Sequence, residues 1–373
     1  MKEPKIRFKG FCGEWKECTL SNIITVNSGK DYKHLEKGTI PVYGTGGYML
    51  SVNTSLSEHD AIGIGRKGTI DKPQYLNAPF WTVDTLFFLT TNNGDNLDFL
   101  FNLSQNIRWQ KYDESTGVPS LSKNNIDKIK TCIPNKFEQQ SVASFFTSLD
   151  AQISASTARL ASLKQMKAAS LQAMFPQEGE TVPKVRFKGF DGEWKAVKLG
   201  EIFSERNESN INGEMLSVTQ HNGIIKASEN GRFDNSNSDK SGYKVVMVGD
   251  IAYNSMRMWQ GASGYSPYEG IVSPAYTVII PQEGIHSSFF AYLFKNESII
   301  KTFRLHSQGL TSDTWNLKFP AFSKIEVLFP MNIDEQKQIA SFFTSLDRQI
   351  ALHTQRLEKL KQIKAACLDK MFV

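Results

Sequence analysis

Two stretches of this sequence occur twice, and this duplication constrains the fold more than any other feature of the chain. Residues 4–23, PKIRFKGFCGEWKECTLSNI, return as residues 183–202, PKVRFKGFDGEWKAVKLGEI. Residues 138–175 return as residues 335–372, and both copies contain the hexapeptide FFTSLD. The segments between these repeats differ in length and barely resemble each other. The sequence therefore predicts one scaffold that presents two different surfaces, rather than a solenoid of many short units.

The longer repeat has the heptad spacing of a coiled-coil helix, because its apolar residues recur in alternating steps of four and three. At each start an asparagine, Asn135 or Asn332, precedes a glutamate by three residues, which resembles a capping box. Each apolar seam needs a partner, and antiparallel pairing of the two copies is the simplest arrangement. Pairing with other chains is the alternative. The seam residues are Val142, Phe146, Leu149, Ile153, Leu160 and Leu163, then Ile339, Phe343, Leu346, Ile350, Leu357 and Leu360.

The shorter repeats carry matching cations and aromatic residues. Arg7 and Trp15 of the first copy correspond to Arg186 and Trp194 of the second. These segments could contact a phosphate or a partner subunit. We favour packing against the coiled coil, because the aromatic residues are repeated as faithfully as the cations.

Both segments between the repeats are rich in glycine, polar residues and short apolar runs separated by turn signals. This pattern predicts many short strands with a few helices, and we expect the helices near Leu97–Gln110 and Ser287–Leu305. The predicted fold class is α+β: two domains in a pseudo-two-fold arrangement, joined by two long helices that form an antiparallel coiled coil.

In the first domain, residues 63–68 match the GxGxxG fingerprint of dinucleotide-binding proteins. The segment that follows, with Pro73 close behind, cannot supply the helix that this site requires, so we reject the nucleotide interpretation. A glycine turn that carries two cations can instead approach a phosphate. The alternative is a solvated basic hairpin tip. We predict that Arg66 and Lys67 contact phosphate or guanine, with Thr45 and Lys123 on neighbouring polar loops.

In the second domain, residues 254–260, NSMRMWQ, follow a turn at Gly249 and Asp250. As a strand or loop they would present arginine, asparagine and glutamine, which suit bidentate contacts with guanine and adenine edges. The alternative is that the two methionines and the tryptophan are core and only the polar residues face outward. The predicted base contacts are Asn254, Arg257 and Gln260, with Gln220, Arg232 and Thr311 on adjacent loops.

Composition limits the class of protein. A chain of 373 residues is long enough for two domains, and its net charge of +5 permits nucleic-acid binding without indicating it. No apolar run approaches the length of a membrane span and no signal peptide is recognisable, so we expect a cytoplasmic protein. The four cysteines lack metal-ligand spacing, and the duplication does not preserve them, so we predict no metal site.

Taken together, the sequence resembles the specificity subunit of type I restriction–modification systems over essentially its whole length. The paired FFTSLD helices and the repeated RFKGFxGEWK segments carry this resemblance. So do IPVYGTGGYM (40–49), IGRKGTI (64–70), WTVDTLFFL (81–89), GDIAYNSMRMWQGASG (249–264) and GIVSPAYTV (270–278).

The resemblance implies a bipartite, asymmetric DNA target, with each domain recognising one half. It also implies double-stranded DNA, two modification subunits and restriction subunits as partners. Those partners would use S-adenosylmethionine, ATP and Mg, and this chain would need no cofactor. We find no methyltransferase or nuclease motif here, so we expect a non-catalytic subunit. A coiled-coil scaffold that does not recognise DNA is the alternative, which the modest charge favours.

The implied organisation divides the chain into five parts. Two are target recognition domains, two are spacer helices and one is a linker. In chain order they are the first domain with its repeated segment, 1–135; the first helix, 136–175; the linker, 176–182; the second domain with its repeated segment, 183–332; and the second helix, 333–373.

Overall fold

The computed structural model describes residues 2–220, 223–230, 239–312 and 314–373. The chain forms two compact units. Unit 1 comprises Met1–Ala158 and Thr354–Val373, and unit 2 comprises Arg159–His353. Each unit contains one mixed helix-and-sheet domain and part of both long helices, which confirms the predicted α+β class.

Unit 1 is built on a four-stranded antiparallel sheet with strand order β2-β8-β5-β6. Its central strand β5 is buried along its whole length, which fits the alternation of small and branched residues in AIGIG. The sheet strands are β2 (Ile24–Ser28), β5 (Ala61–Gly65), β6 (Gln74–Leu76) and β8 (Leu86–Thr91). The other strands of this unit are β1 (Lys16–Thr19), β3 (Lys37–Gly44), β4 (Gly47–Val52), β7 (Trp81–Thr82) and β9 (Lys130–Ile133).

Strands β4, β3 and β7 form a second sheet, and β1 pairs with β9. The short helices of unit 1 are α1 (Leu20–Ile23), α2 (Leu97–Asn106), α3 (Lys123–Asp127) and the 3-10 helix η1 (Trp109–Tyr112). Helix α2 ends earlier than the predicted Gln110. Ile107 is extended, and the indole nitrogen of Trp109 donates to the carbonyl of Ser104 at 2.8 Å, which stabilises the chain reversal.

Unit 2 repeats the main sheet in the order β11-β18-β15-β16, although its sequence has diverged from that of unit 1. These strands are β11 (Phe203–Glu205), β15 (Ile251–Asn254), β16 (Ser263–Tyr265) and β18 (Tyr276–Pro281). Three further pairs are β10 (Lys195–Lys198) with β19 (Glu326–Phe329), β12 (Leu216–Thr219) with β13 (Gly223–Lys226), and β14 (Lys244–Val246) with β17 (Gly270–Val272).

The helices of unit 2 are α5 (Leu199–Ile202), α6 (Ser287–Leu293), α7 (Glu297–His306), α8 (Phe319–Phe322) and the 3-10 helices η2 (Ala227–Asn230) and η3 (Met258–Gln260). The single helix predicted over 287–305 is wrong, because the chain breaks between α6 and α7. Asn296 explains the break. Its side chain accepts a hydrogen bond from the amide of Ser298 at 3.0 Å and so begins a new helix.

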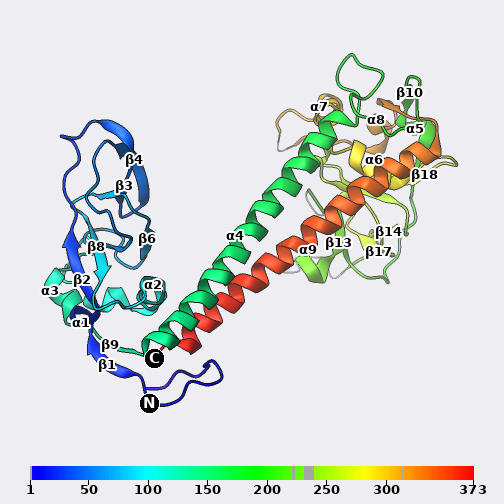
Figure 1. Ribbon diagram of the computed structural model, residues 1–373. Coiled ribbons are helices and arrows are strands. Elements are labelled where there is room, and N and C mark those ends of the chain that lie inside the picture. The colour runs from blue at the N-terminus through cyan, green and yellow to red at the C-terminus, as the bar shows by residue number, and fades with distance from the viewer. Residues whose placement is uncertain (1, 221–222, 231–238, 313) are drawn as a thin grey trace. The chain divides into compact units, whose positions relative to one another are not determined.

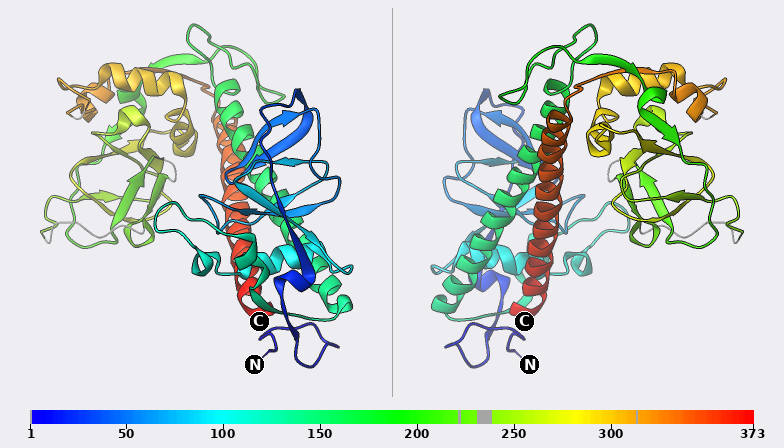
Figure 2. Two further views of the ribbon diagram at one scale, coloured as in Figure 1. Left: turned by 90° about the vertical axis from the view of Figure 1, so that its left-hand side faces the viewer. Right: turned by 90° about the vertical axis from the view of Figure 1, so that its right-hand side faces the viewer.

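The two long helices are α4 (Lys136–Ala173) and α9 (Ile333–Met371) (Figure 1). In unit 1 the early α4 residues Val142 and Phe146 share a core with Phe372, just beyond the end of α9. In unit 2 the late α4 residue Leu163 shares a core with Ile339 from the start of α9. The helices are therefore antiparallel in each unit, as predicted, and two side views show the same pairing (Figure 2).

Most of the predicted seam is buried, and Ile153, Ile350 and Leu360 are half-buried. Two lysines that interrupt the heptad pattern form ion pairs across the helices. Lys167 pairs with Asp347 at 2.5 Å in unit 2, and Lys364 pairs with Asp150 at 2.6 Å in unit 1. Both aspartates belong to the repeated FFTSLD hexapeptide. The duplication thus preserves the polar contacts of the seam as well as its apolar ones.

The repeated N-terminal segments pack on the starts of the long helices. Arg7 donates two hydrogen bonds to the buried carboxylate of Glu138, both at 2.7 Å. Arg186 holds Glu335 in the same way at 2.7 and 2.8 Å. Packing against the coiled coil is therefore confirmed.

The glutamate half of the expected capping boxes is wrong. Asn135 does accept the amide of Glu138 at 3.0 Å, but the Glu138 carboxylate is taken by Arg7. A bidentate guanidinium is a stronger partner than one backbone amide, which explains the preference.

Candidate nucleic-acid interface

The turn after β5 presents the two cations that the sequence singled out. Arg66 and Lys67 are exposed, and the amide of Arg66 donates to the carbonyl of Thr85 at 2.8 Å. The Arg66 guanidinium lies over the ring of Phe87, 5.6 Å from its centroid. Gly68 has a φ of +92°, a conformation that side chains with a Cβ rarely adopt. The turn leads into strand β6 rather than a helix, so the turn is not a dinucleotide-binding site of the GxGxxG type.

Thr45 lies beside this turn. A Cβ placed on Gly68 would be 3.7 Å from the hydroxyl oxygen of Thr45. The side-chain amide of Gln74 fixes the β3–β4 hairpin by donating to the carbonyls of Gly44 at 3.0 Å and Thr45 at 3.1 Å. The structure therefore brings together two segments that the sequence predicted to be neighbours.

Lys123 opens α3, and it is exposed. Just before it, the amide of Leu121 donates to the carbonyl of Arg66 at 2.9 Å. Lys123 therefore enters its helix from a segment tied directly to the cationic turn.

In unit 2 the corresponding turn begins where β15 ends. The side-chain oxygen of Asn254 accepts the amide of Met256 at 3.0 Å, and its carbonyl accepts the amide of Arg257 at 2.9 Å. A 3-10 helix, rather than a strand or an open loop, then carries Met258 and Gln260. Met258 is buried while Met256 is exposed, so the interpretation of all the apolar residues as core is only half right.

Lys295 joins Gln220 to this turn. Its ammonium group donates to the carbonyls of Gln220 at 2.9 Å, Ser263 at 2.8 Å and Gly261. Burial, together with the nearby charge of Lys167, lowers the pKa of Lys295 to about 8. Sequence reasoning missed this residue, because a single lysine near the end of an aromatic helix gives no signal of its distant carbonyl partners.

The loop that carries Thr311 also meets the turn. The amide of Leu317, after this loop, donates to the carbonyl of Ser255 at 2.9 Å. The rings of Trp259 and Trp315 form an edge-to-face pair with centroids 5.2 Å apart. Thr311 and the predicted base contacts of unit 2 therefore belong to segments in direct contact.

The cations of the two turns differ from the repeated arginines, Arg7 and Arg186, which each form an ion pair with a buried glutamate. In the part of the chain that the structure describes, Arg66, Lys67, Lys123 and Arg257 form no ion pair with a carboxylate. Such cations keep their charge available for an external anion. Arg232, the remaining predicted contact, lies outside the described residues.

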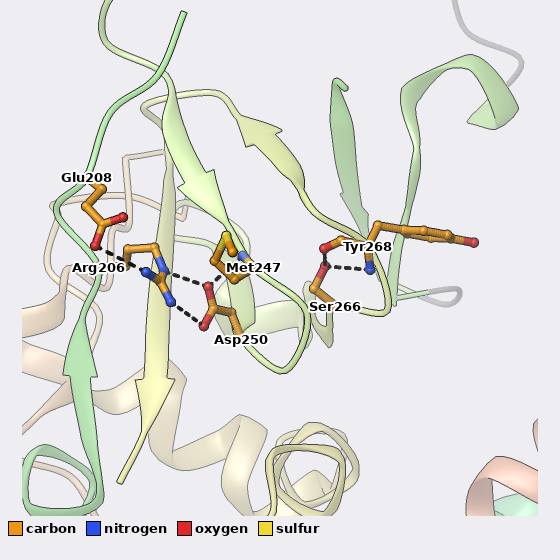
Figure 3. A network of polar contacts seen from close by, with 6 residues as sticks. All are labelled: Arg206, Glu208, Met247, Asp250, Ser266 and Tyr268. Carbon is orange, nitrogen blue, oxygen red and sulfur yellow. Dashed lines mark hydrogen bonds and ion pairs between the residues drawn. The ribbon is translucent and has the colours of Figure 1, made fainter. Parts of the chain in front are cut away.

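An ion pair between the half-buried Arg206 and the buried Asp250 stabilises the start of β15 in unit 2 (Figure 3). Arg206 donates to the two carboxylate oxygens of Asp250 at 2.7 and 3.0 Å, and Asp250 also accepts the amide of Met247 at 2.8 Å. The hydrogen bonds to Asp250 raise the pKa of Arg206. Nearby, Ser266 donates its hydroxyl to the carbonyl of Tyr268 at 2.7 Å. Sequence reasoning did not find the Arg206–Asp250 pair, which fixes the strand that leads to Asn254.

The rest of the described structure contains few other candidate sites. Among the residues described, no group of three or more His, Cys, Asp or Glu side chains could hold a metal ion. All four cysteines are free. No helix in the described ranges is long and apolar enough to cross a membrane. The arrangement is suited to binding anions and polar edges through cations, amides and hydroxyls.

Two domains of one topology, each with a polar, cationic turn and joined by a duplicated helical frame, define a two-domain binding protein. The family model of the type I restriction modification DNA specificity domain matches this chain twice, over residues 13–165 and 191–362. These matches cover most of the sequence, and the protein belongs to this family. The expected resemblance to type I specificity subunits is confirmed.

One solved structure shows the same fold. The S subunit of a type I restriction-modification system from M. genitalium is similar over 100% of this chain and 99% of its own, with a TM-score of 0.70 and 14% identity. The HsdS subunit from Thermoanaerobacter tengcongensis, also 14% identical, aligns with 100% of this chain and 99% of its own chain, with a TM-score of 0.46. A search of curated proteins finds no match.

Proposed function

We propose that this chain recognises a bipartite, asymmetric DNA target and directs adenine-N6 methylation and restriction by partner subunits. One observation carries the proposal: a duplicated frame supports two turns of unlike sequence, whose cations form no ion pair with any described carboxylate. Identical turns would favour a palindromic target, whereas unlike turns favour two different half-sites.

The chemistry of the turns suits base recognition in the major groove. Arginine can contact guanine through two hydrogen bonds, and asparagine or glutamine can do the same with adenine. Unit 2 offers Asn254, Arg257 and Gln260 on one turn, and unit 1 offers Arg66 and Lys67. The same cations can contact phosphates, which supply much of the affinity for any DNA.

The proposal assigns all covalent chemistry to partners. Two modification subunits dock on the repeated helical frame and take the methyl group from S-adenosylmethionine. Restriction subunits use ATP and Mg to complete the nuclease. This chain is then a non-catalytic subunit that acts in the cytoplasm, where its DNA is found. The family assignment supports this division of labour.

The test is genome-wide mapping of N6-methyladenine in cells that contain this chain and its modification subunit. We expect one split motif with two unlike halves. An absence of methylation motifs, or a palindromic motif, would contradict the proposal.

The modest net charge of +5 leaves one competing function, a coiled-coil scaffold that does not recognise DNA sequence. Gel-shift assays on the complex with the modification subunit separate the two functions. Equal binding of all DNA sequences would favour the scaffold.

A further inference from the structure

Each domain carries a loop with an exposed aliphatic residue beside its cationic turn. In unit 1 it is Val118, which is 67% exposed, and in unit 2 it is Leu310, which is fully exposed at 101%. Both follow the same short pattern, serine, any residue, glycine and aliphatic: STGV at residues 115–118 and SQGL at residues 307–310. The pattern recurs although the two domains otherwise have unlike sequences.

The two loops are joined to the two turns in the same way. The amide of Leu121, after the first loop, donates to the carbonyl of Arg66 at 2.9 Å. The amide of Leu317, after the second loop, donates to the carbonyl of Ser255 at 2.9 Å. Arg66 belongs to the cationic turn of unit 1, and Ser255 lies two residues before Arg257 in unit 2. Each loop is therefore tied, at the end where it leads into the next helix, to the turn of its own domain.

The first loop is held in shape by its own polar contacts. The carboxylate of Asp113 accepts the amides of Ser115 at 3.0 Å and Ser120 at 2.9 Å. The carbonyl of Pro119 accepts the amide of Gly68 at 2.9 Å, which adds a second tie to the cationic turn. Val118 is therefore displayed on a loop whose two sides are anchored.

The second loop is fixed by backbone hydrogen bonds and a glycine rather than by an aspartate. Gln308 and Asn316 exchange backbone hydrogen bonds at 2.9 and 2.8 Å, which closes the base of the loop. Gly309 has a φ of +145°, and a Cβ at this position would lie 2.6 Å from the carbonyl oxygen of Thr314. Only glycine fits there, so the residue after it is directed by a fixed backbone. The closed base and the fixed conformation of Gly309 reduce the entropy that Leu310 would lose on binding.

A single exposed aliphatic residue is common on protein surfaces and by itself indicates nothing. Here the residue recurs in the same short pattern in both domains, on loops that are hydrogen-bonded to the turns that carry Arg66 and Arg257. The bases that suit Arg257 and its neighbours expose their edges in the major groove, where the one apolar group is the methyl group of thymine. This methyl group is the complementary partner for an aliphatic tip.

We propose that Val118 and Leu310 each pack against a thymine methyl group in the half-site that their own domain recognises. This inference rests on the proposed function, and it adds an apolar contact to the polar contacts of the turns. Leu310 selects thymine in the half-site of unit 2, and Val118 does so in the half-site of unit 1.

The test uses the complex with the modification subunit and a duplex that carries the mapped target. Each thymine of both half-sites is replaced in turn by deoxyuridine, which lacks only the methyl group. For the unaltered complex we expect one replacement in each half-site to weaken binding about 3- to 10-fold, in keeping with a methyl group removed from an apolar contact. Fluorescence anisotropy measures the affinity.

Leu310→Ala should weaken binding to the unmodified duplex by a similar factor and remove the sensitivity to deoxyuridine in its own half-site only. Val118→Ala should do the same for the other half-site. Leu305→Ala is the matched control, because Leu305 is 75% exposed in the same domain but lines a separate cavity beside Glu178 and Leu328. The control should bind like the unaltered complex, and all three variants should keep their melting temperature.

Failure of this inference is distinct from failure of the proposed function. If the unaltered complex prefers no sequence, the proposed function is wrong. If it binds its target specifically but no deoxyuridine replacement matters, or Leu310→Ala stays as sensitive as the unaltered complex, only the inference about the loop tips is wrong. A mapped half-site without any A·T pair would overturn it as well.

Discussion

The repeated frame and the two turns differ in whether their arginines form ion pairs. In the frame, Arg7 and Arg186 are each held by a buried glutamate at 2.7 to 2.8 Å. In the turns, the exposed arginines have no such partner among the residues that the structure describes. The difference shows that a cation repeated in the sequence is not automatically a DNA contact. The repeated arginines stabilise the scaffold, whereas Arg66 and Arg257 form no ion pair with any described carboxylate.

The two domains also differ in how they support their turns. In unit 2, Lys295 on the segment after α6 donates to three carbonyls and so holds the turn from inside the protein. In unit 1, Gln105 occupies the equivalent place, counted from the start of α2, and backbone hydrogen bonds hold the turn instead, from Arg66 to Thr85 at 2.8 Å and from Gly68 to Pro119 at 2.9 Å. One topology therefore supports two turns through unlike contacts, which allows each turn to change without the other.

The largest expected effect comes from breaking the shared frame. Arg186→Met leaves the carboxylate of Glu335 buried without its partner, and we expect a loss of about 3–5 kcal/mol in the free energy of unfolding of unit 2. Arg7→Met should do the same to unit 1. Hydrogen exchange measured by mass spectrometry reports on each unit separately. Lys2→Met is the control, since its ion pair with Glu17 is exposed, and it should change nothing measurable. Unequal losses in the two units would show that the frames are not equivalent.

Removing a turn cation should affect recognition rather than folding. Arg257→Ala should weaken binding to the half-site of unit 2 by about 1–3 kcal/mol, or roughly 5- to 150-fold, because a bidentate base contact is lost. Arg66→Ala should affect the other half-site. Binding and methylation of duplexes altered in one half at a time measure the effect. Arg159→Ala, an exposed arginine on α4, is the control. Unchanged specificity in Arg257→Ala would remove this residue from the site.

Raising the pH should weaken the binding of DNA by unit 2 selectively. Between pH 7 and pH 9, Lys295 loses its proton because its pKa is lowered to about 8, and the neutral amine has too few N–H groups for three carbonyls. The charge of Lys167 lowers this pKa further and that of Asp347 opposes it. We expect affinity for the half-site of unit 2 to fall by ~5-fold, about the value of one hydrogen bond, while the other half-site is unaffected.

The sign of the stability effect separates this loss from unfolding. Unfolded lysine keeps its proton up to the ordinary value of 10.5, so between about pH 8 and 10.5 the unfolded chain binds more protons than the folded one. This group therefore makes the free energy of unfolding rise with pH over that window. Lys295→Met should bind its half-site weakly at pH 7 and show no further loss at pH 9. A variant that kept the pH dependence would exclude Lys295 as its source.

The smallest expected effect concerns the ion pairs of the seam. Lys167→Met and Lys364→Met remove pairs that are partly exposed to solvent, so each should cost no more than about 1 kcal/mol. Hydrogen exchange of the two long helices measures the change in each unit. A clearly larger loss of stability in one unit would show that the two ion pairs are not equivalent, although the duplication implies that they are.

The sequence predicted the features that recur with a period or as a repeat. The heptad seam, the antiparallel pairing and the α+β domains follow from the local spacing of residue types and from the internal duplication of the sequence. The break at Asn296 was missed because its cap competes with an otherwise continuous apolar pattern. Lys295 and the pair of Arg206 with Asp250 were missed because their partners are distant in the sequence and follow no period. The predicted turn residues were placed together in space, but their contacts with DNA remain predictions.

Unit 1 is built from both the first and the last residues of the chain, and this has a consequence for folding during translation. Phe372 packs against Trp15, Phe99 and Phe146 in the core of that unit, with ring centroids 5.4 to 6.2 Å apart. Translation therefore makes most of unit 1 first but can complete its core only after all of unit 2 has emerged. Domains usually fold in the order of their synthesis. In this chain the domain that is synthesised first is completed last. A prematurely terminated chain would therefore expose the aromatic core of unit 1 to chaperones and proteases.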